Sequence, residues 1–321
     1  MKIGIIGTGA YAIAISSLLE NKNHDITMWT KLEDEYNELV TNHTNSKMID
    51  YKLDNKIKFT MKLKDLAKDK DIIIIAIPAK FVKNVIMNIK PYYENSHILI
   101  ATKGIIEENK SLIHKFLAQE LNTDKIACIS GPSFAKEIIK KEPLGLTIAS
   151  KNTESLNVFN TLFKEVNYLT IQCISDIIGC QLCGMFKNIF AIISGILDGM
   201  KVTNSTNAKF LTDASLEIKK IIYAFNGDDN TFNTYAGIGD FILTCTSIES
   251  RNYTLGRLIG ENKDFETYKK NTTIEGLENL DTIYVILKEM CIESKLINIL
   301  YEILYLNKKK ENILEYLKKS E

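Results

Sequence analysis

The chain has 321 residues, of which 40 are basic and 40 acidic, so its formal net charge is zero. This balance offers no bulk attraction to nucleic acid or to an anionic membrane surface, and we expect neither partner. The length predicts two domains, each with a core of its own. No segment approaches twenty uninterrupted apolar residues, so we expect a cytoplasmic protein without membrane insertion.

The first half of the chain alternates short isoleucine-rich segments with amphipathic ones. The expected strands cover residues 2–7, 25–29, 71–78, 97–102, 126–132, 146–150 and 168–172. Amphipathic helices are expected between most of them, for example at residues 81–90 and 111–121. Continuous apolar strands that alternate with helices predict a mainly parallel sheet covered on both faces.

The pattern changes at about Ser175, after which helical spacing dominates. The expected helices cover residues 176–197, 208–225, 276–290 and 294–306. The sequence therefore predicts an open α/β domain at residues 1–174, followed by an all-α domain at residues 175–321.

The segment "KIGIIGTGAYA" combines a strand, a glycine turn and the start of a helix, with Gly7, Gly9 and Ala12 in the form GxGxxA. The first glycine permits the sharp turn, the second lets the backbone approach a pyrophosphate, and the small third residue lets helix and strand pack closely. The helix start also offers free amides to phosphates. A turn made only for packing is the alternative, but the position at the first strand favours a Rossmann-like dinucleotide-binding domain.

The second expected strand ends at Trp29 and is followed by Thr30 and Lys31. An acidic residue at this point would hold the ribose hydroxyls of NAD, whereas Lys31 suits the 2′-phosphate of NADP. Glu33 and Asp34 lie close enough to weaken this argument, so the expected cofactor is NADP or NAD.

Six cysteines are spread over the chain, and two of them, Cys180 and Cys183, form a CxxC motif. A structural zinc site needs four ligands, and no second pair accompanies this motif. We expect these cysteines to pack against helices and predict no metal site.

A dehydrogenase that reduces a carbonyl needs a proton donor, and the four histidines are poorly placed for that role. His24 and His97, for instance, stand at strand starts, whereas ligands bind beyond the carboxyl ends of strands. Lys187 lies inside an apolar helix with Cys183, Gly184, Ala191 and Ser194 as its neighbours at helical spacing. Two interpretations remain open: the small residues leave room for a ligand beside Lys187, or they serve close helix packing.

The segment "GIGDFILTCTSIESRN" repeats this combination of polar and apolar residues. Asp240 and Thr244 are four residues apart and are expected on one helix face. Ser250, Arg251 and Asn252 follow, and a guanidinium beside an amide suits a phosphate. A surface arginine beside an asparagine that caps a turn is the alternative.

Taken together, these segments resemble the bacterial type of NAD(P)-dependent glycerol-3-phosphate dehydrogenase. The segments that carry the resemblance are the glycine turn, "ATKGIIEE" (101–108), "SGPSFAKE" (130–137), "GMFKNIFAIISGILDGM" (184–200), "GIGDFILTC" (237–245), "SRN" (250–252) and "IEG" (274–276). They follow the order of the family over nearly the whole chain.

The resemblance implies reduction of dihydroxyacetone phosphate to sn-glycerol 3-phosphate, the backbone of glycerophospholipids, and a helical domain like the C-terminal domain of 6-phosphogluconate dehydrogenase. It implies that Lys187 is the catalytic acid and base. The implied substrate contacts are Lys103, Gly131, Ser133, Lys187, Asp240, Ser250, Arg251 and Asn252. The implied cofactor contacts are Gly7, Gly9, Ala10, Tyr11, Ala12, Lys31, Lys103, Ala135, Arg251, Thr273 and Glu275. Enzymes of this kind are often homodimers.

The chain departs from the family pattern at several positions. Ala10 stands where serine is common, Ala12 replaces the third glycine, and Asp213 with Ala214 replaces the usual Arg-Gly, so we assign no role to Asp213. Two other functions stay open at this point: a related two-domain dehydrogenase for another hydroxyacid or sugar acid, and a dinucleotide sensor without catalysis.

Overall fold

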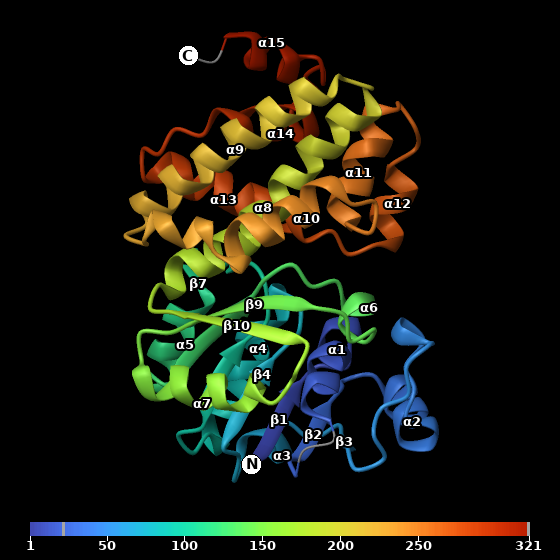
Figure 1. The fold of residues 1–321 in the computed structure, drawn as a ribbon, viewed down its shortest axis with the longest axis vertical. Helices are drawn as coiled ribbons and strands as arrows, with labels where there is room; N and C mark the ends of the chain where they lie inside the picture. The colour runs from blue at the N-terminus through green and yellow to red at the C-terminus, as the bar shows by residue number, and fades with distance from the viewer. Residues whose placement is uncertain (21–22, 320–321) are drawn as a thin grey trace. The chain divides into compact units, whose positions relative to one another are not determined.

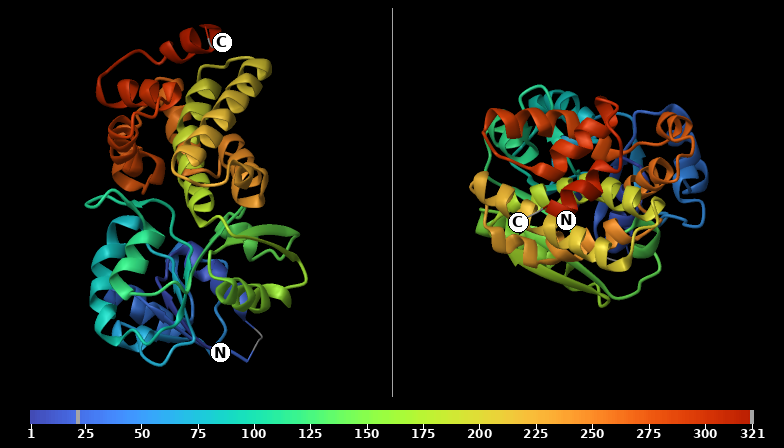
Figure 2. Two further views of the ribbon diagram at one scale, coloured as in Figure 1. Left: turned by 90° about the vertical axis from the view of Figure 1, so that its left-hand side faces the viewer. Right: turned by 90° about the horizontal axis from the view of Figure 1, so that it is seen from above.

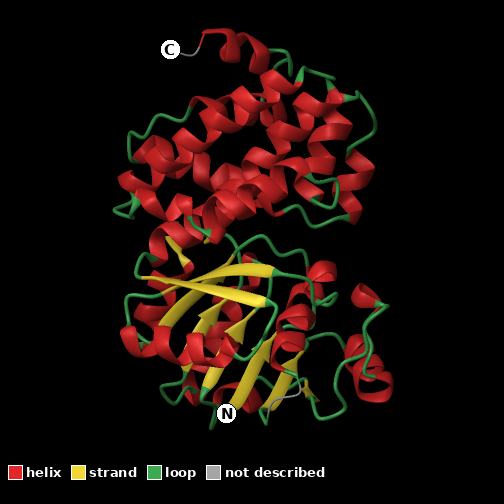
Figure 3. Cartoon of the chain, viewed as in Figure 1, coloured by secondary structure: helices red, strands yellow, loops and turns green. Residues whose placement is uncertain are grey.

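The computed structural model describes residues 1–20 and 23–319 of the chain. These residues form two compact units, one spanning Met1–Ile177 and the other starting at Ile178 (Figure 1). The strands that the structure describes lie in the first unit, and the described secondary structure of the second unit is helical (Figure 3). The expected fold class, a Rossmann-like α/β domain followed by an all-α domain, is therefore confirmed.

The first unit holds an eight-stranded sheet in the order β10-β9-β8-β5-β4-β1-β2-β3. The strands are β1 (Lys2–Ile6), β2 (Asp25–Trp29), β3 (Lys58–Thr60), β4 (Ile72–Ile75), β5 (His97–Ile100), β8 (Ile126–Ser130), β9 (Leu144–Ala149) and β10 (Leu169–Ile174), and β6 (Ile105–Ile106) pairs with β7 (Ser111–Leu112) in a separate hairpin. From β3 to β8 the neighbouring strands are parallel, and β9 pairs antiparallel with β8. The strand order reverses between β1 and β4, and in open α/β sheets such a point forms a ligand-binding crevice.

Helices cover both faces of this sheet. They are α1 (Ala10–Leu19), α2 (Glu33–Asn42), η1 (Ser46–Met48), α3 (Lys64–Ala67), α4 (Ala79–Ile89), η2 (Lys90–Tyr92), α5 (Ile113–Leu121), α6 (Ala135–Ile138) and α7 (Thr153–Lys164). One face carries α1, α6 and α7, and the other carries α3, α4 and α5 (Figure 2). The central strands are buried on both sides, as "IIII" in β4 requires, because its four side chains are 0% exposed.

The seven strands expected from the sequence are present, but β3 and the β6–β7 hairpin were not anticipated. Each of these is only two or three residues long, which is too short for a periodic pattern to stand out. The segment 111–121, expected to be one helix, begins with β7 and continues as α5.

The second unit consists of helices around one apolar helix, α8. The elements are α8 (Ile177–Gly199), α9 (Asn204–Ala224), η3 (Asp229–Asn233), the π-helix η4 (Tyr235–Gly239), α10 (Asp240–Thr246), α11 (Arg251–Gly260), α12 (Glu266–Asn271), α13 (Glu275–Glu289), α14 (Lys295–Tyr305) and α15 (Asn312–Lys319). Helix α8 is long and apolar enough to cross a membrane, but its apolar window is fully buried within the fold, as in a core helix. The predicted α9 began at residue 208; the helix starts four residues earlier because Thr203 caps it by accepting from the Thr206 amide.

Helices α8 and α11 approach so closely that their backbones touch at glycines. A Cβ atom on Gly195 would lie 2.0 Å from the Tyr253 carbonyl oxygen, and one on Gly256 would lie 1.9 Å from that of Ile192. Gly199 and Gly260 continue the same contact one turn further along both helices. The small residues of α8 therefore set the distance between two helices that carry polar side chains.

Candidate functional site

The carboxyl edge of the parallel strands carries the glycine turn. Gly7 follows β1 with φ +121°, and a Cβ atom there would lie 2.5 Å from the Ala76 carbonyl oxygen, so the position requires glycine. Gly9 precedes α1, and a Cβ atom built on it meets no atom within 4 Å. The turn thus leaves open space at the start of α1, whose N-cap residue Gly9 has no side chain that could cap the helix. An uncapped helix start with free room before it fits the pyrophosphate of a dinucleotide.

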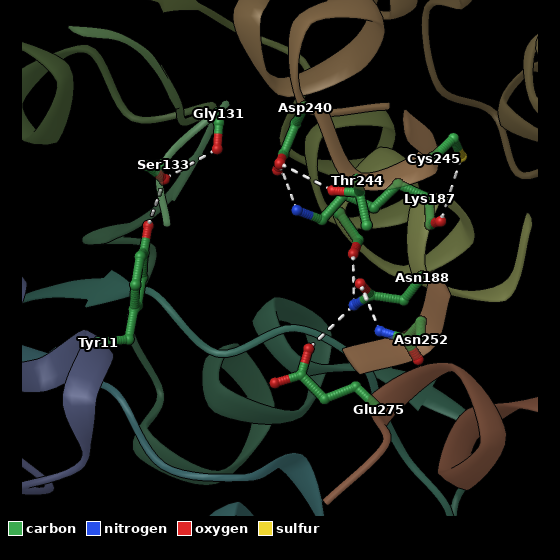
Figure 4. A network of polar contacts seen from close by, with 11 residues as sticks. Tyr11, Gly131, Ser133, Lys187, Asn188, Asp240, Thr244, Cys245, Asn252 and Glu275 are labelled. Carbon is green, nitrogen blue, oxygen red and sulfur yellow. Dashed lines mark hydrogen bonds and ion pairs between the residues drawn. The ribbon is translucent and has the colours of Figure 1, made fainter. Parts of the chain in front are cut away.

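Three more of the residues expected at the site gather around Tyr11 at this edge. The Tyr11 hydroxyl lies 3.3 Å from the Ser133 hydroxyl, which in turn donates to the Gly131 carbonyl at 2.8 Å (Figure 4). The Lys103 ammonium lies 5.8 Å from the centre of the Tyr11 ring. The sequence separation is more than 120 residues between Tyr11 and Ser133, and the sheet topology brings them together.

The remaining predicted cofactor residues of the first unit differ in exposure. Ala12 is buried, Ala10 and Ala135 are half-buried at the starts of the neighbouring helices α1 and α6, and Lys31 is exposed after β2. The geometry groups Ala10 and Ala135 near the glycine turn and leaves Lys31 in solvent.

A carboxylate that the sequence did not single out lies directly behind the turn. Glu35 accepts hydrogen bonds from the hydroxyls of Thr8 at 2.7 Å and Thr30 at 3.1 Å, and from the ammonium of Lys47. Burial alone would raise the pKa of Glu35, but these three donors outweigh it and lower the pKa below its ordinary value. Glu35 is therefore ionised and ties Thr8 of the glycine turn to the end of β2.

In the second unit, Lys187 of α8 forms an ion pair with Asp240 at the start of α10 (Figure 4). The side chains are 7% and 1% exposed, respectively. Because each charge is taken out of water, each depends on the other, and the contact favours the charged form of both. The prediction that Asp240 and Thr244 share a helix face is confirmed, since the Thr244 hydroxyl donates to Asp240 at 3.5 Å.

A π-helical turn, η4, delivers Asp240 to this position. It spans Tyr235–Gly239 and ends directly before Asp240. A Cβ atom on Gly237 would lie 2.2 Å from the Phe232 carbonyl oxygen, so the turn packs against η3 through its backbone. Short π-helical segments are rare and occur preferentially at functional sites.

A chain of amide hydrogen bonds connects α8, α11 and α13. Asn252 donates to Asn188 at 3.0 Å, and Asn188 donates to Glu275 at 2.9 Å (Figure 4). The Oδ1 atom of Asn252 accepts from the Gly276 amide at 2.8 Å. Arg251 completes the group with an ion pair to Glu275 at 3.7 Å. The side-chain amide of Asn252, which the sequence placed among the substrate contacts, therefore also holds the start of α13.

Ser250, Arg251 and Asn252 form the N-terminus of α11. Ser250 is the cap, because its hydroxyl accepts from the Tyr253 amide at 3.3 Å. Capping of this turn thus falls to the serine, whereas the alternative sequence interpretation gave it to asparagine. The Arg251 side chain is 51% exposed, and Thr273 is exposed in the loop before α13.

The small residues beside Lys187 on α8 serve helix packing in at least one place. Ser194 donates to the Cys245 carbonyl of α10 at 2.6 Å, and the Cys245 thiol lies 3.8 Å from the Lys187 carbonyl. Burial raises the pKa of Cys245, so this group remains a thiol. Cys180 and Cys183 are likewise buried on α8.

Sequence reasoning missed roles for Asn188, Gly276 and the group around Glu35. A signal existed for Asn188, an amide in an otherwise apolar helix that is now seen to be 5% exposed. Glu35 had no such signal, because it lies in an acidic run, Glu33–Glu35, that is typical of a solvated helix start.

Residues 2–156 match the family described as NAD-dependent glycerol-3-phosphate dehydrogenase N-terminus, and residues 176–315 match the one described as its C-terminus. A protein of Staphylococcus haemolyticus named glycerol-3-phosphate dehydrogenase (NAD(P)+) is 32% identical over 311 residues, covering 95% of this chain and 93% of the relative. The chain belongs to the NAD-dependent glycerol-3-phosphate dehydrogenase family. The resemblance inferred from the sequence motifs is thereby confirmed.

Other members of the glycerol-3-phosphate dehydrogenase family agree over the full length. A Leptospira biflexa protein of the same name is 31% identical over 324 residues, covering 99% of this chain and 97% of the relative. The crystal structure of glycerol-3-phosphate dehydrogenase from Coxiella burnetii superposes with a TM-score of 0.93 at 28% identity, covering 99% of this chain and 98% of that one.

Replacing Gly9 by alanine should weaken dinucleotide binding without loss of fold. The methyl group would enter open space with no protein atom within 4 Å, where the pyrophosphate would approach. We expect affinity to fall about 5- to 150-fold, since forcing a methyl group into an occupied volume costs roughly 1–3 kcal/mol. Titration followed by the fluorescence of Trp29 measures affinity, and thermal unfolding measures stability. Unchanged affinity would contradict the assignment of the turn.

Replacing Glu35 by glutamine should change how stability depends on pH. Because the pKa of Glu35 is lowered in the folded state, its contribution is present above the ordinary pKa of 4.5 and is lost as pH falls through the folded-state pKa. The free energy of unfolding of the wild type should exceed that of Glu35→Gln at about pH 7, and the difference should shrink by about pH 4. Urea denaturation at both pH values provides the measurement, with the exposed Glu33→Gln as control. A difference that stays constant would refute the role of Glu35.

Proposed function

We propose that this chain interconverts dihydroxyacetone phosphate and sn-glycerol 3-phosphate with NAD(P)H, in the service of glycerophospholipid synthesis. Membership of the glycerol-3-phosphate dehydrogenase family supports this reaction. The observation that carries it is the buried Lys187–Asp240 ion pair, because a carbonyl reductase needs a fixed proton donor. The division of labour is part of the proposal: residues 1–174 bind the dinucleotide and residues 175–321 bind the substrate.

A bound nicotinamide supplies the hydride for this reaction. In the first unit, the residues proposed to hold the dinucleotide are Gly7, Gly9, Ala10, Tyr11, Ala12, Lys31, Lys103 and Ala135. In the second unit, Arg251, Thr273 and Glu275 are proposed to contact it. Support comes from the open space before α1 and from the uncapped amides at its start.

Lys187 is the proposed catalytic residue. As C2 of dihydroxyacetone phosphate is reduced, negative charge grows on its carbonyl oxygen, and the Lys187 ammonium stabilises that charge and donates a proton from Nζ. In the reverse direction, neutral Lys187 accepts the proton of the C2 hydroxyl. Asp240 orients the ammonium through its Oδ1 atom, and Thr244 orients Asp240 in turn. A charge fixed in this way stabilises a transition state without having to reorganise.

The phosphate of the substrate is assigned to the N-terminus of α11. Arg251 offers a half-exposed guanidinium, Ser250 lies beside it, and Asn252 keeps one amide hydrogen outside its two internal bonds. A positive helix end and a guanidinium suit a phosphate group. Lys103, Gly131 and Ser133 of the first unit are the other proposed substrate contacts.

Two finer points of the proposal rest on the family resemblance and the composition of the chain. We place the protein in the cytoplasm and expect it to act as a homodimer. Its partner is a small phosphorylated molecule.

The experiment that tests the function adds dihydroxyacetone phosphate to the full chain with NADPH or NADH and follows the loss of reduced-nicotinamide absorbance. We expect oxidation that depends on dihydroxyacetone phosphate and the appearance of glycerol 3-phosphate. The keto forms of hydroxyacids and of sugar acids serve as alternative substrates in parallel reactions with the same reduced cofactors. Dinucleotide binding without oxidation by any of these substrates would identify a sensor and overturn the proposal.

Replacing Lys187 by alanine should lower turnover while dinucleotide affinity is kept. A general acid contributes roughly 10²–10⁴-fold, and we expect a loss in that range. A loss of less than about tenfold would show that Lys187 is not the proton donor. The single variant removes the ammonium that compensates the buried charge of Asp240, and loss of one partner of a buried ion pair costs about 3–5 kcal/mol of stability. The double variant Lys187→Ala, Asp240→Ala removes both charges and should be equally inactive, with stability restored toward the wild type.

A further inference from the structure

The group around Glu35 connects the glycine turn to a lysine that the reaction does not use. Glu35 Oε2 accepts from Thr8 and Thr30, and Oε1 accepts from Lys47 Nζ. Thr8 belongs to the glycine turn, and Thr30 directly follows β2. The Lys47 ammonium is therefore two hydrogen bonds away from both the turn and the end of the second strand.

A second set of contacts fastens Lys47 to the same place through its backbone. Asn45 donates from Nδ2 to the Thr8 carbonyl at 3.1 Å, and its Oδ1 accepts from the Lys47 amide at 2.8 Å. Asn45 is 1% exposed, so this bridge is shielded from water. The backbone and the side chain of Lys47 are both anchored to the glycine turn, which fixes the position of the ammonium.

The end of the second strand is where a dinucleotide-binding domain reads the 2′-position of the adenosine ribose. An acidic side chain there accepts hydrogen bonds from the ribose hydroxyls of NAD. Glu35 does not fit that role, because its Oε2 already accepts two hydrogen bonds, its Oε1 is paired with Lys47, and the residue is only 9% exposed. Its carboxylate faces inward, whereas the Lys47 side chain is 48% exposed.

We propose that Lys47 is a specificity-determining residue that contacts the 2′-phosphate of NADP(H), and that Glu35 is the positioning residue that orients it. The inference rests on the proposed function, because it concerns the cofactor of that reaction. It names the preferred cofactor as NADP(H).

The chemistry of the two cofactors explains the preference. An ammonium donates hydrogen bonds but accepts none, and it attracts a phosphate far more strongly than a neutral hydroxyl. The Glu35 carboxylate accepts hydrogen bonds from two threonine hydroxyls on its buried side. An incoming phosphate therefore meets the exposed ammonium and not the carboxylate. Lys47 thus strengthens the binding of NADP(H) and contributes little to the binding of NAD(H).

The single tryptophan of the chain provides a direct measurement of binding. Trp29 is the last residue of β2, is 8% exposed, and precedes Thr30. Its fluorescence can be followed while the full chain is titrated with adenosine 2′,5′-bisphosphate or with adenosine 5′-monophosphate. These two probes differ in the 2′-phosphate alone, and neither requires catalysis.

For the wild type we expect tighter binding of adenosine 2′,5′-bisphosphate than of adenosine 5′-monophosphate. Lys47→Gln should weaken binding of the bisphosphate about tenfold, the equivalent of one hydrogen bond to a charged group, and leave the monophosphate unchanged. Lys47→Arg keeps the charge and should retain most of the preference. The kcat/KM values with NADPH and NADH should follow the same pattern, with kcat unchanged and the change confined to the KM for NADPH.

Lys151→Gln is the matched control. Lys151 is exposed and follows β9, which runs antiparallel to β8 and therefore ends at the edge opposite to the glycine turn. Its replacement should change neither affinity. Lys31→Gln distinguishes the contribution of Lys31 from that of Lys47. It should weaken binding of adenosine 2′,5′-bisphosphate less than Lys47→Gln does.

Three results would overturn the inference: equal wild-type affinity for both probes, an equal loss for both probes in Lys47→Gln, and loss of the preference in Lys31→Gln alone. An equal loss of affinity for both probes would mean that Lys47 supports the fold of the site and does not recognise the 2′-phosphate. These results are distinct from failure of the proposed function. That failure would appear as no substrate-dependent oxidation with either cofactor, even where the preference between the two adenosine probes is intact.

Discussion

Lys187 and Asp240 place two opposite charges inside the apolar helical unit, and the arrangement around them depends on that pair. Removing one partner of a buried pair leaves an uncompensated charge at a cost of about 3–5 kcal/mol, so the two residues hold each other in place. Because they belong to α8 and α10, the pair also fixes these helices relative to each other. The π-helical turn before Asp240 and the hydroxyl of Thr244 then leave the carboxylate little freedom.

The first unit uses a buried carboxylate in a related way. Glu35 gathers two hydroxyls and an ammonium, and through Thr8 it reaches the glycine turn itself. In each unit a shielded carboxylate thus directs a lysine, although one lysine is buried and the other is half-exposed. A carboxylate with several donors keeps its charge at neutral pH, and an ionised partner holds an ammonium at a defined point in space.

Much of this architecture follows from the sequence because its signals are local. The strand β1, the turn at Gly7 and Gly9, and the helix α1 occupy eighteen consecutive residues, and each part has a recognisable pattern. Lys187 is conspicuous because a charge in an apolar helix conflicts with its surroundings. The order of the motifs along the chain is by itself enough to indicate the family.

Other features could not be foreseen, because they depend on contacts between distant residues. The approach of Tyr11 to Ser133 requires the strand order of the sheet, and the amide chain from Asn188 through Asn252 to Gly276 requires three packed helices. Glu35 looks like any acidic residue in a first helical turn until Lys47 folds against it. The strand β3 is so short that tertiary pairing, and not its composition, defines it.

The glycine contact between α8 and α11 has a consequence for the choice of substrate. Lys187 lies on α8 and Arg251 begins α11, and the two backbones touch at Gly195 and Gly256 with no side chain between them. The distance between the helix backbones that carry the proposed proton donor and the proposed phosphate anchor is therefore set by main-chain contact, which adapts less than side-chain packing does. Under the roles proposed for Lys187 and Arg251, a molecule one carbon longer or shorter between its reacting atom and its phosphate would not reach both side chains.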